Sequence, residues 1–121
     1  MIKASRRMLG LLAATCALAL APLVPAAAAP NALEVSVFCE NLGMRYNQGS
    51  FSCDAFASGG TGDYSYNWSA VQNATILDNW GSYIYGSCAI NQTARVNVVV
   101  TDSSGASISK IGRVLCRKVA S

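Results

Sequence analysis

The chain of 121 residues contains no histidine, the side chain that most often serves as a general base near neutral pH. A Ser-His-Asp or Cys-His arrangement is therefore excluded. A carboxylate pair of the kind that glycosidases use would need two of the six acidic residues, and the sequence places none of them in a pocket. The six are Glu34, Glu40, Asp54, Asp63, Asp78 and Asp102. We therefore expect no catalytic residues and no enzyme activity.

The cysteines favour disulfide chemistry over metal binding. Of the five, Cys16 lies in an apolar N-terminal stretch, and the four others are Cys39, Cys53, Cys88 and Cys116. An even number of cysteines in a short exported chain predicts two disulfides. A zinc site would have to use four scattered thiolates, because the chain has neither a Cys-x-x-Cys spacing nor a histidine. We expect no metal and no cofactor.

Aromatic side chains are the remaining groups that could bind a ligand. Tyr83 and Tyr85 alternate with residues on the face that holds Cys88, so we expect them to point away from the core. Exposed rings can stack on sugars or anchor a protein partner. The alternative is that outward tyrosines only supply β-propensity and cross-strand packing. The candidate binding residues are Tyr46, Trp80, Tyr83 and Tyr85.

The N-terminal residues have the pattern of a secretory signal peptide. Lys3, Arg6 and Arg7 precede an uncharged run over residues 8–24, and small residues follow at 26–29. We predict a signal peptide over residues 1–28, with cleavage after Ala27 or Ala28, and a single domain over residues 29–121. The paired arginines also fit a twin-arginine signal, so the export route stays open. The mature protein is expected to be secreted or periplasmic.

Removal of the predicted signal peptide changes the charge balance. Three of the nine Lys and Arg residues lie in it, which leaves six basic residues against six acidic ones. The basic character of the whole chain thus belongs to the leader. We expect no nucleic-acid partner, and no membrane association after the signal peptide is removed, because binding to nucleic acid or to an anionic membrane needs a basic patch.

Short alternating or β-branched runs, separated by Gly, Asn, Asp and Ser, predict an all-β sandwich. We expect a loop over residues 41–49, a glycine turn over 59–62, a hairpin turn over 102–105, and a bulge near Gly112 that reconciles the faces of the last strand. The expected strands cover residues 33–40, 51–57, 64–69, 74–77, 82–90, 94–101 and 108–116.

Three segments resemble bacterial immunoglobulin-like domains of the polycystic-kidney-disease (PKD) type. They are the string CDAFASGG at 53–60, the pattern Tyr-x-Tyr-x-Trp at 64–68, and the run VNVVVTDSSG at 96–105. The resemblance covers most of residues 33–116. It implies an immunoglobulin-like sandwich of about seven strands, with Trp68 in the core between the sheets. The acidic loop that often follows the Trp in that family is replaced here by Ser69-Ala70-Val71.

The resemblance also implies a disulfide pairing. In such a sandwich the first and last strands run side by side, which predicts Cys39 bonded to Cys116. The second and fifth strands are antiparallel neighbours, which predicts Cys53 bonded to Cys88. The alternative joins Cys39 to Cys53 and Cys88 to Cys116, and it requires no assumption about the fold.

Two functional hypotheses follow from these features. In the first, the protein is a secreted, non-catalytic module that binds a polysaccharide or a protein at the cell exterior through its exposed aromatic residues. In the second, it is a small secreted inhibitor of a protease or glycosidase that acts through an exposed loop such as residues 41–49. Fold resemblance alone does not choose between them.

Overall fold

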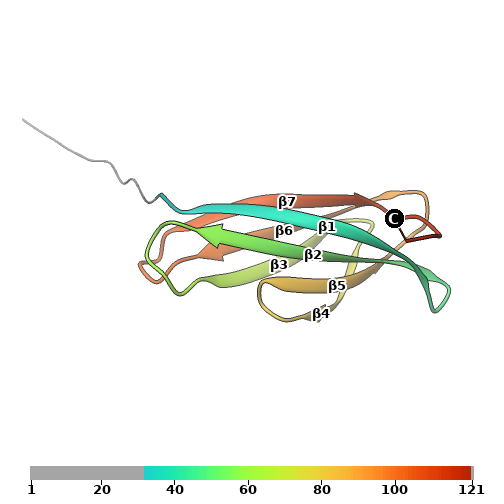
Figure 1. Cartoon of the computed structure of the whole chain (residues 1–121), viewed down its shortest axis with the longest axis horizontal. Helices are drawn as coiled ribbons and strands as arrows, with labels where there is room; N and C mark the ends of the chain where they lie inside the picture. The colour runs from blue at the N-terminus through green and yellow to red at the C-terminus, as the bar shows by residue number, and fades with distance from the viewer. Residues whose placement is uncertain (1–31, 121) are drawn as a thin grey trace, which may run out of the picture. The chain divides into compact units, whose positions relative to one another are not determined.

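The computed structural model describes residues 32–120, which form seven β-strands in two sheets (Figure 1). The all-β, two-sheet prediction is confirmed. The predicted signal peptide lies outside the described residues. The strands are β1 (Glu34–Arg45), β2 (Gln48–Ser58), β3 (Ser65–Gln72), β4 (Thr75–Asn79), β5 (Tyr83–Cys88), β6 (Thr93–Thr101) and β7 (Ser107–Leu115).

All neighbouring strands within the two sheets are antiparallel. The first sheet has the order β1-β2-β5-β4 and the second has the order β3-β6-β7. Strands β1 and β7 belong to different sheets but lie side by side where the two sheets meet (Figure 1). Across residues 32–120 there is no helix long and apolar enough to cross a membrane.

The core lies between the sheets and follows the period-two alternation of the strands. On β6 the residues Ala94, Val96, Val98 and Val100 are all buried, while those between them are partly exposed. Trp68 on β3 is only 7% exposed, which confirms the prediction that it is a core residue.

The predicted loop over residues 41–49 is wrong. Strand β1 continues to Arg45 and β2 begins at Gln48, so only Tyr46 and Asn47 form the turn. Both have positive φ, 50° and 67°, as a type I′ hairpin turn requires. The register shifts once, between Asn41 and Gly43, which is a β-bulge. The Asn and Gly residues that predicted a loop instead mark this bulge and the tight turn.

The predicted bulge near Gly112 is also wrong, because the register between β6 and β7 is unbroken. Ile111 simply faces outward and is 41% exposed. Gly112 serves a different purpose: a Cβ at this position would lie 2.5 Å from Val37 Cγ1 and 2.7 Å from Cys39 Sγ. Only glycine lets β1 approach β7 this closely.

The predicted disulfide pairing is wrong, and the structure has the alternative pairing. Cys39 is bonded to Cys53, and Cys88 is bonded to Cys116. Cys39 and Cys53 are register partners in the hairpin of β1 and β2. The predicted pairing requires Cys39 to lie near the end of its strand, whereas β1 continues for six more residues.

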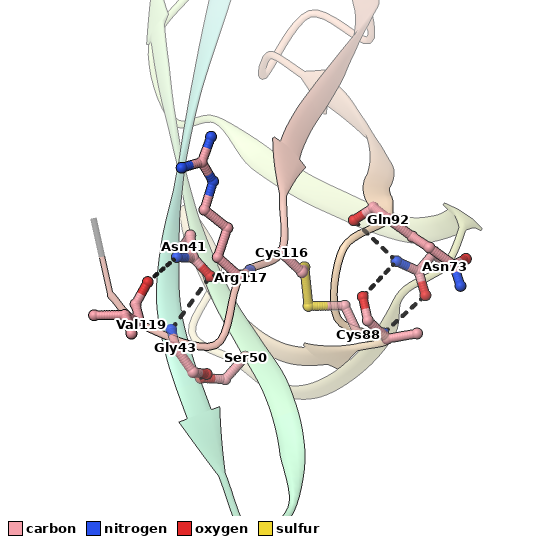
Figure 2. The surroundings of a disulfide bond; sticks show 10 residues. Asn41, Gly43, Ser50, Asn73, Cys88, Gln92, Cys116, Arg117 and Val119 are labelled. Atoms are coloured by element: carbon pink, nitrogen blue, oxygen red, sulfur yellow. Dashed lines mark hydrogen bonds between the residues drawn. A yellow bond between two sulfur atoms is a disulfide. The ribbon is translucent and has the colours of Figure 1, made fainter.

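The register between β2 and β5 shows why Cys53 cannot reach Cys88. Cys53 lies opposite Ile84, and Cys88 lies opposite Gly49, which is four residues before Cys53 on β2. At about 3.3 Å per residue this separation is about 13 Å. A disulfide needs Cα atoms within about 7 Å of each other. Cys88 instead joins Cys116, just beyond β7, so this bond links the two sheets (Figure 2).

A buried asparagine fixes the C-terminal segment to β1. The side-chain oxygen of Asn41 accepts hydrogen bonds from the backbone N–H of Gly43 (3.3 Å) and of Arg117 (3.0 Å), and its amide donates to the carbonyl of Val119 (2.9 Å) (Figure 2). The N–H of Met44 donates to the carbonyl of Lys118. Asn41 is only 2% exposed, so these contacts satisfy its buried polar atoms.

A buried carboxylate joins two turns at another place in the domain. Asp102 accepts hydrogen bonds from the backbone N–H of Ser104 and Ala106 and from the hydroxyl of Ser104, all within the hairpin of β6 and β7. It also accepts one from the N–H of Thr61 in the glycine turn after β2. The Ser104 hydroxyl and the Thr61 N–H lower the pKa of Asp102 below its usual range, because both stabilise the ionised form.

Replacing Asn41 should destabilise the domain. We expect Asn41→Ala to lower the free energy of unfolding by about 1–3 kcal/mol, since it leaves buried backbone groups without partners. Urea unfolding measures the change. Asn67→Ala is the matched control, because Asn67 is exposed on β3 and its loss should cost less than about 0.5 kcal/mol. Equal destabilisation by both variants would contradict the inference that the hydrogen bonds of Asn41 stabilise the domain.

The lowered pKa of Asp102 predicts a pH-dependent contribution to stability. Because the carboxyl has a lower pKa in the folded state than the usual value of about 3.9, its contribution is complete above about pH 4 and is lost as the pH falls through the folded-state pKa. We expect Asp102→Asn to lower the melting temperature at neutral pH. The difference in melting temperature between this variant and the unmodified protein should become smaller below about pH 4.

Thermal unfolding between about pH 2 and pH 7 tests this prediction. Asp63→Asn removes the same charge from an exposed turn residue and provides the control. A gap for Asp102→Asn that stays constant at all pH values would show that the carboxylate charge is not what holds the two turns together.

Candidate functional site

Three of the four candidate aromatic residues lie together on the outer face of the four-stranded sheet. Tyr83 and Tyr85 are outward residues of β5, because Ile84 between them is fully buried. Trp80 lies in the turn before β5 and is 62% exposed. The ring centres of Trp80 and Tyr83 are 5.4 Å apart, with the planes tilted by 34°. The two rings form one apolar platform.

The turn that carries Trp80 is fixed by hydrogen bonds from several sides. The N–H of Trp80 donates to the carbonyl of Tyr83 (2.8 Å), and the N–H of Gly81 donates to the side-chain oxygen of Asn79 (2.9 Å). From the core, the indole N–H of Trp68 donates to the carbonyl of Gly81 (2.6 Å). The core tryptophan therefore helps to position the exposed one.

Two charged side chains flank the second tyrosine. The guanidinium carbon of Arg45, at the end of β1, lies 5.8 Å from the ring centre of Tyr85, within the range of a cation–π contact. Asp78 on β4 is the register partner of Tyr85. A donor group from one edge strand and an acceptor group from the other thus border the same ring.

Small residues on β2 allow side chains from β1 and β5 to meet. Ser50 and Ser52 alternate with the core residue Phe51 and so point to the outer face, yet both are buried. Ser52 is the register partner of Tyr85. Side chains as short as serine leave room for Arg45 to extend over β2 toward the tyrosine ring.

These side chains enclose an open groove of about 280 Å³, which we call the aromatic groove. It combines apolar ring faces, one cation that donates hydrogen bonds, and one carboxylate that accepts them. Such a surface can bind a ligand that presents apolar patches beside hydroxyl groups. The lining residues are Leu42, Arg45, Asp78, Trp80, Tyr83 and Tyr85.

Tyr46 does not belong to the groove. It is the first residue of the two-residue hairpin turn and is 96% exposed. The exposed loop on which the inhibitor hypothesis rested is likewise not present, because residues 41–49 form the turn end of the hairpin of β1 and β2.

A larger hollow, of about 400 Å³, lies between the end of β5 and the turn of the first hairpin. Its lining includes Asn73 but no aromatic and no charged residue. The amide of Asn73 is already engaged in three hydrogen bonds, to the carbonyls of Ala89 and Gln92 and from the N–H of Ala89 (Figure 2). We interpret Asn73 as a structural clamp on the loop after β5.

The carboxylates are spread over the domain and are not gathered at one place. Among the residues that the structure describes, no three side chains of Cys, Asp or Glu lie close enough together to hold a metal ion. Glu34, Glu40 and Asp54 are distributed over the outer face of β1 and β2, and Asp102 is used to join two turns.

Sequence reasoning missed Leu42 and Arg45, because both were assigned to a loop. It also missed two exposed aromatic residues on the same sheet: Phe38 is 72% exposed and Phe56 is 60% exposed. The sequence pattern does indicate that both are exposed, since Phe38 alternates with the inward residues of β1 and Phe56 alternates with those of β2. The parity of the strands predicts that both rings face solvent.

Comparisons of the chain with protein-family models, with curated proteins and with solved structures each found no match.

Proposed function

We propose that this protein is a secreted, non-catalytic, immunoglobulin-like module that binds a polysaccharide at the cell exterior through the aromatic groove. The observation that carries the proposal is the gathering of Trp80, Tyr83 and Tyr85 with Arg45 and Asp78 on one outer face. Ring faces pack against the apolar faces of sugars, while the guanidinium and the carboxylate bond to hydroxyl groups.

The size of the groove favours a sugar chain over a folded protein. A volume of about 280 Å³ is close to the lower end of the range of about 300–1,000 Å³ that small-ligand sites have. A stable protein partner needs about 800 Å² of surface on each side. The open side of the groove allows a long chain to continue beyond the bound unit.

Other features support the remaining parts of the proposal. Two disulfides are typical of proteins in an oxidising compartment outside the cytoplasm, which agrees with the predicted signal peptide. The strand orders β1-β2-β5-β4 and β3-β6-β7 correspond to those of a constant-type immunoglobulin sandwich. They support the immunoglobulin-like part of the proposal.

Retention on insoluble polysaccharides and on bacterial cell-wall material tests the function. We expect Trp80→Ala and Tyr83→Ala each to weaken binding by about tenfold, because exposed aromatic residues at the centre of a site carry much of the binding free energy. Tyr46→Ala is the matched control: it removes an aromatic side chain that is 96% exposed and outside the groove, and it should leave binding unchanged.

Two results would remove the basis of the proposal. One is retention that Trp80→Ala and Tyr83→Ala leave unchanged. The other is a groove-dependent interaction with an extracellular protein and none with any polysaccharide, which would identify the partner as a protein.

A further inference from the structure

The outer face of β1 and β2 carries an apolar patch surrounded by carboxylates. Phe38 and Phe56 are diagonal neighbours, since Phe38 pairs with Asp54 and Phe56 lies two residues further along β2. Diagonal side chains lie about 7–8 Å apart, within reach for aromatic rings. Glu34 and Glu40 lie on the same face of β1. We call these five residues the acidic face.

The outer face of the other sheet has the opposite charge. Arg95 on β6 lies directly opposite Arg113 on β7. Like charges in this position repel each other. The Nε of Arg95 is buried and has no hydrogen-bond partner in the described part of the chain. Two exposed aliphatic residues, Ile111 and Leu115, lie on either side of Arg113 along β7. We call these four residues the basic face.

The two faces are complementary in charge and in apolar content. One has exposed phenyl rings between carboxylates, and the other has exposed aliphatic side chains beside guanidinium groups. We propose that the acidic face of one copy of the protein docks on the basic face of a second copy. Carboxylates from the second copy would then separate the repelling pair Arg95 and Arg113, and the rings of Phe38 and Phe56 would pack on Ile111 and Leu115.

The contact joins two different faces, so it leaves one acidic face and one basic face free at the ends of every pair. Such a heterologous contact continues into an open chain or closes into a ring. Tyr83 on β5 is the register partner of Asp54, so the aromatic groove borders the acidic face. Trp80 lies beyond Tyr83, in the turn before β5.

Analytical ultracentrifugation of the mature protein over a range of concentrations tests the docking. We expect the mean mass to rise with concentration beyond that of a dimer. Association should weaken in about 1 M NaCl, where the screening length falls to about 3 Å. Two variants remove one face each without adding charge: Phe38→Ser with Phe56→Ser disables the acidic face, and Ile111→Ser with Arg113→Ser disables the basic face.

Mixing the two variants gives the sharpest result. Each variant alone should be a monomer, with self-association weakened by more than about tenfold. The mixture should form a one-to-one pair that grows no further, because only one working face of each kind remains. The substituted side chains are exposed, and unchanged circular dichroism spectra would show that the variants fold. Phe38→Ser and Arg113→Gln are milder single variants that should each reduce association.

Three results would overturn the docking: a wild-type protein that stays monomeric at millimolar concentration, a single-face variant that still forms dimers, or a mixture that does not pair. Trp80→Ala should leave the mean mass unchanged. Since the groove and the two faces are tested by different variants, loss of polysaccharide binding and loss of self-association are distinguishable outcomes.

Discussion

The disulfide between Cys88 and Cys116 is the constraint on which the rest of the domain depends. It links the end of β5 in one sheet to the residue after β7 in the other. The two cysteines are 28 residues apart in the sequence. In the chain-entropy model, closing a loop of this length in the unfolded chain contributes about 3.6 kcal/mol to the free energy of unfolding. A domain of about ninety residues has a modest core, so this is a large share of its stability. Asn41 and Asn73 form their hydrogen bonds beside this bond, and they fix the segments that lead away from it (Figure 2).

Because the sheets are held together from the inside, their outer faces are free to carry side chains that contribute little to stability. Among the described residues, the buried side-chain polar atoms are hydrogen-bonded, with the Nε of Arg95 as the exception. Asn41 holds the C-terminal segment, and Asp102 joins the glycine turn to the last hairpin. Large apolar residues such as Phe38 and Trp80 are exposed although folding gains nothing from their exposure. Surfaces of this kind are expected where a protein binds something else.

The sequence was informative wherever a property depended on neighbouring residues. Period-two alternation predicted the seven strands and the outward direction of Tyr83 and Tyr85, while the core position of Trp68 was implied by the family resemblance. It failed where contacts join distant parts of the chain. Gly112 looked like the site of a bulge, but its lack of a side chain is explained by Val37, a residue 75 positions earlier on another strand. The disulfide pairing failed for the same reason, because it depends on strand register, which no local pattern reports.

The charged surfaces and the aromatic groove also depend on contacts between distant residues. Six acidic and six basic residues in residues 29–121 indicate a chain near neutrality, and composition alone therefore predicts no charged surface. The register sorts these charges by sheet: Glu34, Glu40 and Asp54 share one outer face, while Arg95 and Arg113 share the other. The same register, together with the short side chains of Ser50 and Ser52, brings Arg45 to Tyr85. A net charge near zero is thus compatible with two oppositely charged faces. The pairing of the strands, and not their composition, decides which surfaces this protein offers to a partner.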